Sequence, residues 1–127
     1  MFRLKRSKAD KLFSDYIRHR DEWTCRRCKV YYQPPTAAIQ NSHYFGRAGK
    51  STRWDPENCD ALCTKCHFVW GSEDREGYRD FKVKQLGQKR FDALYRRAKI
   101  PTKVDESLIV LWCKSELLKL GVGRKRD

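Results

Sequence analysis

The chain has 127 residues, enough for one compact domain with short extensions. It carries 29 lysines and arginines against 16 aspartates and glutamates, and this formal net charge of +13 predicts attraction to a polyanion such as nucleic acid. A basic surface without a single partner is the alternative. No apolar run is long enough to span a bilayer, and the basic N-terminal segment lacks the apolar centre of a signal peptide. We therefore expect an intracellular protein that has no membrane partner and keeps its thiols reduced.

The first expected element is a helix over residues 7–21. Leu12, Phe13, Tyr16 and Ile17 recur there at helical spacing. Lysines and arginines occupy the other positions, which is the pattern of an amphipathic helix with one face in a core.

A hairpin is expected next. Residues 37–45 favour an extended strand, and the basic segment 46–52, GRAGKST, is typical of a loop. Arg53 and Trp54 then begin the returning strand. After a turn, residues 59–62 can adopt an extended conformation that leads towards the second CxxC pair.

The remainder of the chain predicts helices. Thr64 can cap a short helix, and Ser72 can cap a longer one that ends near Leu86. Two more helices follow, one ended by Pro101 and one capped by Asp105. The last helix carries an apolar stripe, expected to pack in the core, of Leu108, Leu111, Trp112, Leu117 and Leu118.

These elements predict a single α+β domain that is mostly α. Its parts are an N-terminal helix (7–21), a small ββα core (22–71), C-terminal helices (72–121) and a basic tail (122–127).

Two CxxC pairs are the strongest motif of the chain: Cys25 with Cys28, and Cys63 with Cys66. One CxxC turn places two thiolates around one ion, so two such turns predict a tetrahedral structural zinc site. The ion would hold the ends of the hairpin segment together and stabilise the fold directly. A disulfide framework is the alternative, and Cys59 lies close enough in sequence to leave open which thiols bind.

His43 and Asn58 lie between the two CxxC pairs, and His67 follows the second pair directly. The stretches that contain them, NSHYFGRAG, WDPEN and LCTKCHF, resemble the HNH (His-Me finger) endonucleases in which two CxxC pairs support a ββα-metal, treble-clef-like core. The segment FSDYIRHRDEWTCRRC is similar to phage NinG-type recombination proteins and phage HNH endonucleases. The resemblance covers roughly residues 10–100.

The resemblance implies a metal-dependent hydrolase of DNA phosphodiester bonds. His43 matches the general base and His67 the ligand of a catalytic cation, Mg²⁺ or Mn²⁺. Asn58 matches the residue that either fixes the loop around the base or contacts the cation. Ser42 stands where the family usually has a second, acidic or histidine ligand, so the cation would be held mainly by His67, with Asn58 and Ser42 as weaker ligands.

The resemblance also implies the biological setting. The expected substrate is duplex or branched DNA, nicked or cut through both strands during phage recombination or packaging in the cytoplasm of a bacterial host. Arg47, Lys50 and Arg53, in or beside the hairpin loop, are the expected DNA contacts. Two alternatives are a non-catalytic zinc module that binds DNA as an accessory protein and a zinc-held protein-interaction domain.

Overall fold

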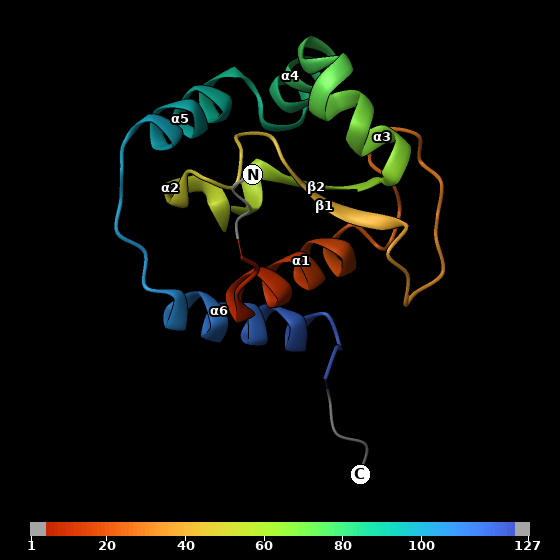
Figure 1. Cartoon of the computed structure of the whole chain (residues 1–127), viewed down its shortest axis with the longest axis vertical. Coiled ribbons are helices and arrows are strands. Elements are labelled where there is room, and N and C mark those ends of the chain that lie inside the picture. Colours follow the sequence, from red (N-terminus) through yellow and green to blue (C-terminus); the bar gives the residue numbers. More distant parts are fainter. Residues whose placement is uncertain (1–4, 124–127) are drawn as a thin grey trace.

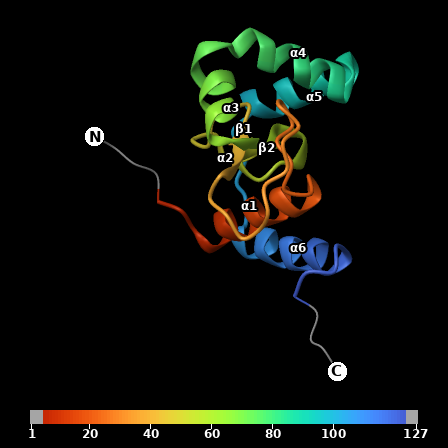
Figure 2. The same ribbon diagram turned by 90° about the vertical axis from the view of Figure 1, so that its right-hand side faces the viewer.

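The computed structural model describes residues 5–123 and has the α+β, mostly helical fold that the sequence predicts (Figure 1). Two antiparallel strands, β1 (Ile39–His43) and β2 (Cys59–Cys63), form one small sheet. Ile39 pairs with Cys63 at one end of the hairpin and His43 with Cys59 at the other. Figure 2 shows helices on both sides of this sheet, so the strands lie in the middle of the molecule.

One helical layer consists of α1 (Lys8–Arg20) and α6 (Glu106–Lys119), which pack against each other. Helix α1 is the helix predicted over residues 7–21. Its N-terminus has a capping box, in which the backbone N–H of Asp10 donates to Ser7 Oγ and the backbone N–H of Ser7 donates to the Asp10 carboxylate. Phe13 and Ile17 are fully buried in the core that α1 shares with the hairpin.

The other helical layer begins with α3 (Thr64–Phe68), which follows β2 directly and completes a ββα unit. A π-helical turn (Val69–Glu73) links α3 to α4 (Arg75–Leu86), and α5 (Gln88–Lys99) follows. Gly87 has φ +82°, a left-handed conformation that suits glycine and ends α4 where the sequence predicts.

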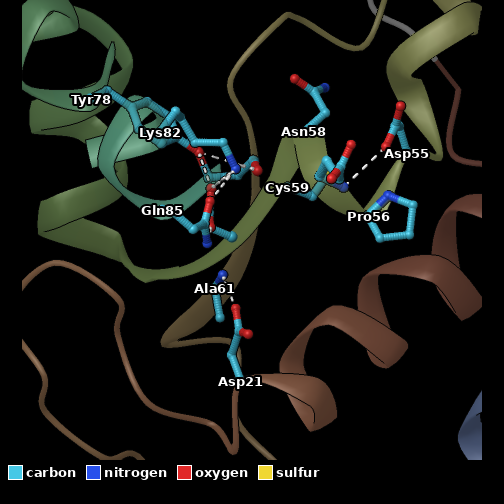
Figure 3. A network of polar contacts seen from close by, with 12 residues as sticks. Asp21, Asp55, Pro56, Asn58, Cys59, Ala61, Tyr78, Lys82 and Gln85 are labelled. Atoms are coloured by element: carbon cyan, nitrogen blue, oxygen red, sulfur yellow. Dashed lines mark hydrogen bonds and ion pairs between the residues drawn. The ribbon is translucent and has the colours of Figure 1, made fainter. Parts of the chain in front are cut away.

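Helix α4 is attached to the hairpin by a buried polar network centred on Asp60 (Figure 3). The Lys82 ammonium donates to Asp60 Oδ2 over 3.0 Å, and the Tyr78 hydroxyl donates to the same oxygen over 3.1 Å. Gln85 donates to Asp60 Oδ1 over 3.0 Å. Because each charge in the network has a partner, a lysine and an aspartate can both be fully buried here.

The hairpin loop is longer than predicted, and the expected return strand at Arg53 and Trp54 is wrong. These residues belong instead to the end of a short helix, α2 (Lys50–Arg53), and its C-cap. The Asp10 carboxylate accepts hydrogen bonds from Arg53 and from Trp54 Nε1, which ties the two residues to α1 rather than to β1. A 3₁₀ turn (Pro56–Asn58), capped by Asp55, then leads into β2.

Two of the expected helix caps are also wrong. Cys63 occupies the N-cap position of α3, and the Thr64 hydroxyl accepts a hydrogen bond from Gln40 instead. Ser72 lies inside the π-helical turn, and Asp74 caps α4 by accepting from the backbone of Gly77. The cap predicted at Asp105 is confirmed, because its side chain accepts from the backbone of Ser107.

The apolar stripe of α6 is only partly in the core. Leu117 is buried, and Trp112 packs edge-on against Tyr16 of α1 with ring centroids 5.1 Å apart. Leu108 and Leu111 are about 60% exposed, so the prediction that the whole stripe is core is wrong. Leu118 is exposed as well.

Of the predicted basic tail, residues 124–127 lie outside the described residues. Within residues 5–123, no helix has the length and apolar character needed to cross a membrane.

Candidate functional site

The four CxxC cysteines come together at the start of the hairpin and of α3. The Sγ atoms of Cys25, Cys28, Cys63 and Cys66 all lie within 4.8 Å of one another. Cys28 Sγ and Cys63 Sγ are 3.9 Å apart, which is close to the roughly 3.8 Å expected between two thiolates on one tetrahedral zinc and far from a disulfide bond. The four thiols could therefore hold a structural metal ion such as zinc.

The first CxxC pair sits on a tight turn. The backbone N–H of Cys25 donates to Val30 O, and that of Lys29 donates to Cys25 O, both over 2.9 Å. Lys29 adopts a left-handed φ of 66° to close the turn. The Arg27 guanidinium donates to Cys66 Sγ over 3.3 Å, a contact that favours a thiolate at that position.

The other two cysteines lie apart from this cluster. Cys59 and Cys113 are fully buried, and burial raises the pKa of both thiols, that of Cys113 to about 11. Both behave as small core residues, so the ligand set that the sequence left open is the two CxxC pairs.

A cavity of about 490 Å³ lies between α1 and β1, and it brings together His43 and His67. His43 comes from the end of β1 and His67 from α3, so the ββα unit places both rings on the same hollow. A polar series at four-residue spacing on the N-terminal segment and α1 lines the opposite wall: Arg6, Asp10, Ser14 and Arg18.

His43 is held in one tautomer. Its Nε2 lies 2.9 Å from the backbone oxygen of Arg53, and a carbonyl can only accept, so Nε2 carries the proton and Nδ1 keeps its lone pair. Burial lowers the pKa of His43 to about 4, and the positive charge of Arg47 acts in the same direction. The ring is therefore uncharged at neutral pH, the form that can accept a proton.

His67 is oriented by a residue that sequence reasoning missed. Its Nδ1 lies 2.7 Å from Gln40 Oε1, and the Gln40 amide nitrogen donates in turn to Thr64 Oγ1 over 3.4 Å. In this arrangement the Nδ1–H of His67 donates to Gln40 Oε1, and Nε2 keeps a lone pair that is available to a metal. Burial lowers the pKa of His67, which also favours the neutral ring.

Asn58 does not face the cavity. It is 0% exposed, its Oδ1 accepts from the backbone of Phe45, and its Nδ2 donates to the backbone oxygens of Phe45 and Thr52. The side chain thus spans the hairpin loop that follows His43. Of its two expected roles, fixing the loop agrees with this geometry, and the expectation that it contacts a cation is wrong.

Ser42 lies on the opposite side of β1 from the cavity. Its side chain is buried, and its Oγ accepts from the Tyr78 hydroxyl of α4 over 3.1 Å. Ser42 is not among the residues that line the cavity with His67, and its hydroxyl is already engaged by Tyr78. The expectation that it is a cation ligand is wrong.

The three expected DNA contacts differ in position. Lys50 is exposed at the start of α2, and Arg47 is half-buried on the wall of the cavity. Arg53 is only 7% exposed, and its guanidinium is bound to the Asp10 carboxylate and to the backbone oxygen of Lys5. The expectation for Arg53 as a DNA contact is therefore wrong, because this side chain holds the loop onto α1.

Two buried polar atoms of residues on the cavity wall have no hydrogen-bond partner, namely Asn41 Oδ1 and Arg18 Nε. Sequence reasoning singled out neither residue. The four-residue spacing of Arg18, Ser14 and Asp10 predicts that these residues share one face of the α1 helix, and this signal could have identified them as one wall of a site.

Within residues 5–123, the four cysteines are the one group of three or more histidine, cysteine or acidic side chains placed to share an ion. A cation bound at His67 would thus take most of its remaining ligands from water and from the substrate. Comparison of the chain with protein-family models, with curated proteins and with solved structures finds no match, so the resemblance to HNH endonucleases stays an interpretation of the motifs.

Proposed function

We propose that this protein is a metal-dependent HNH-type endonuclease that hydrolyses DNA phosphodiester bonds. The observation that supports the proposal most directly is the cavity that His43 and His67 share, because a neutral imidazole and a second imidazole with a free Nε2 line the same hollow. Arginines of the cavity wall supply the positive charge that a DNA backbone requires.

In this proposal His43 is the general base. Its Nδ1 accepts a proton from the attacking water. The hydrogen bond from Nε2–H to the Arg53 carbonyl keeps the ring in place. Asn58 keeps the loop after His43 in position through its three backbone hydrogen bonds.

His67 would hold the catalytic cation, Mg²⁺ or Mn²⁺, through Nε2. The fit rests on Gln40, whose Oε1 accepts a hydrogen bond from Nδ1–H and so leaves the lone pair on Nε2. When bound, such a cation stabilises the negative charge that develops on the phosphate and on the leaving oxygen. The products would carry 5′-phosphate and 3′-hydroxyl ends.

We propose zinc as the ion of the four cysteines. All four ligands are thiols in two CxxC pairs, a set that zinc favours over the oxygen-preferring Mg²⁺. From the resemblance alone we also propose a setting in phage or prophage DNA processing within a bacterial cell.

A second candidate is a zinc-held DNA-binding accessory protein without catalysis. The absence of an acidic ligand beside His67 among the residues that the structure describes favours it. It predicts DNA binding without cleavage.

The test is incubation of the purified protein with supercoiled plasmid and with a branched DNA junction, in Mg²⁺ or Mn²⁺ and in EDTA. We expect nicked or linear plasmid, or cut junction, only when a divalent cation is present. DNA that is bound but left intact in both cations would replace the proposal with the accessory protein.

A further inference from the structure

The wall of the cavity that faces His43 and His67 belongs to α1 and the segment just before it. Arg6, Asp10, Ser14 and Arg18 follow at intervals of four residues, so they form one polar stripe along the helix. This stripe lies on the cavity side of a helix whose other face is core. A ligand in the cavity would touch both α1 and the ββα unit.

Arg18 is incompletely satisfied on this wall. Its Nε is buried and has no hydrogen-bond partner. Its acidic partner, Asp15, lies 3.6 Å from Nη2, and its guanidinium lies over the ring of Trp23, 5.5 Å from the centroid. These contacts orient the guanidinium, and 21% of the side chain stays exposed on a residue that lines the cavity. The exposed N–H groups of this guanidinium can donate to a ligand with several acceptor oxygens.

The cavity has more positive than negative charge. Arg6, Arg18 and Arg47 line it, and among residues 5–123 Asp10 is the one acidic lining residue. The Asp10 carboxylate is engaged by Arg53 and by Trp54 Nε1, and Arg47 Nη2 lies 3.5 Å from its Oδ2. The net charge of the lining residues is positive, and the preferred ligand of the cavity is an anion with several acceptor oxygens.

We infer that Arg18 is a phosphate-binding residue of this cavity, with exposed N–H groups of its guanidinium donating to non-bridging oxygens of the DNA backbone. The inference rests on the proposed function for the identity of the anion. It makes α1, and not only the hairpin loop, a DNA-facing wall. A planar guanidinium suits a phosphate because two of its N–H groups can reach two oxygens at once.

The direct test is NMR observation of arginine side-chain Nε–Hε resonances while a 12-base-pair DNA duplex is titrated into the zinc-loaded protein in the absence of Mg²⁺ and Mn²⁺. The Arg18 resonance is identified by its loss in Arg18→Lys. We expect it to shift saturably with DNA. The Arg20 resonance is the internal control and should stay in place, because Arg20 Nε already donates to Asp21 over 2.9 Å. An Arg18 resonance that stays in place while the backbone spectrum reports binding would overturn the inference.

A binding comparison gives the second readout. Arg18→Ala should weaken affinity for the same duplex roughly tenfold or more, the loss of one charge-assisted contact. Lys11→Ala, on an exposed position of α1 away from the cavity, should change it much less. Equal losses in the two variants would contradict a specific contact.

The experiments distinguish failure of the Arg18 assignment from failure of the nuclease proposal. If Arg18 responds to DNA but the wild-type protein cuts none, the nuclease proposal fails and the assignment of Arg18 stands. If the wild-type protein cuts DNA without any response of Arg18, the assignment of Arg18 fails and the nuclease proposal stands.

Discussion

Hydrogen bonds to the histidine rings define the candidate site at the scale of single residues. Each of the two rings has one nitrogen occupied by a fixed acceptor, the Arg53 carbonyl for His43 and Gln40 Oε1 for His67. The opposite nitrogen of each ring is left with its lone pair. The acceptor for His67 is a side-chain oxygen of Gln40, which a mutation can remove. The acceptor for His43 is a backbone oxygen, which a substitution of Arg53 leaves in place.

Replacement of Gln40 by alanine tests the role of His67. Without its acceptor the ring can rotate or change tautomer, so we expect cleavage to fall by about 10- to 100-fold, with partial recovery at higher Mn²⁺ concentration. The measurement is the initial rate of plasmid nicking against cation concentration. Gln88→Ala, on α5, is the control and should behave as wild type. An unchanged cation dependence in Gln40→Ala would contradict the role of Gln40.

Motif spacing predicted the candidate site residues that form a recognisable order along the chain. It missed the residues that only the tertiary fold brings beside them. His43, Asn58, His67 and the four cysteines were found because their order is distinctive. Gln40 was missed because only the packing of α3 on β1 places it beside His67.

The partner of Arg53 could not be read from the sequence either. Its carboxylate, on Asp10, lies 43 positions earlier in the chain. The sequence near Arg53 therefore looks like a basic DNA contact, and only the tertiary fold reveals a buried ion pair.

At the scale of elements, the cysteine cluster joins three parts of the chain. Cys25 and Cys28 lie on the turn after α1, Cys63 ends β2, and Cys66 lies on α3. A metal ion held there would fix the start of α3, and hence His67, relative to the hairpin. In a domain with so small a sheet, the free energy of metal binding would contribute directly to folding.

The metal prediction is that purified protein contains about one zinc per chain, measured by elemental analysis. Cys28→Ser should lose the metal and the cooperative unfolding transition together. Cys113→Ser, in the α1–α6 interface, should keep the metal and lose only modest stability. Cooperative, wild-type unfolding of metal-free protein would contradict the structural role of the ion.

The strand and helix predictions succeeded where side-chain periodicity dominates and failed where long-range polar contacts decide. Helix α1 and the end of α4 at Gly87 follow from local signals. Arg53 and Trp54 follow a loop as a return strand would, yet both side chains bind Asp10 of α1, and this contact favours the short helix α2. The exposed side of α6 was misjudged because its apolar residues occur on every face.

At the scale of the whole molecule, the net charge of +13 is the feature most relevant to DNA. Part of this charge is internal, since Arg53 and Lys82 are buried in ion pairs. The basic side chains that remain beside the cavity include Arg6, Arg18 and Arg47, and Lys50 is exposed nearby in the chain. In this account the charge of the whole surface attracts DNA over long range, and these four side chains make the local phosphate contacts.

Salt dependence measures how many of these contacts form. If these four side chains each neutralise one phosphate, the slope of log affinity against log salt concentration is roughly −4. The measurement is fluorescence anisotropy of a labelled duplex over a salt series. The double variant Arg18→Ala and Arg47→Ala should reduce the slope by about 2. A slope near zero for the wild type would show that phosphate contacts do not drive binding.

The most direct test of the central claim is the single-turnover cleavage rate of His43→Ala beside His19→Ala, each with its DNA affinity and zinc content. His19 lies outside the cavity and interacts with Trp23 and Asp15, so it is a matched histidine control. The account predicts that His43→Ala loses at least roughly 10²-fold in rate while affinity and zinc stay near wild type, and that His19→Ala cuts normally. A His43→Ala protein that cuts DNA as fast as wild type would contradict the assignment of this cavity as the active site.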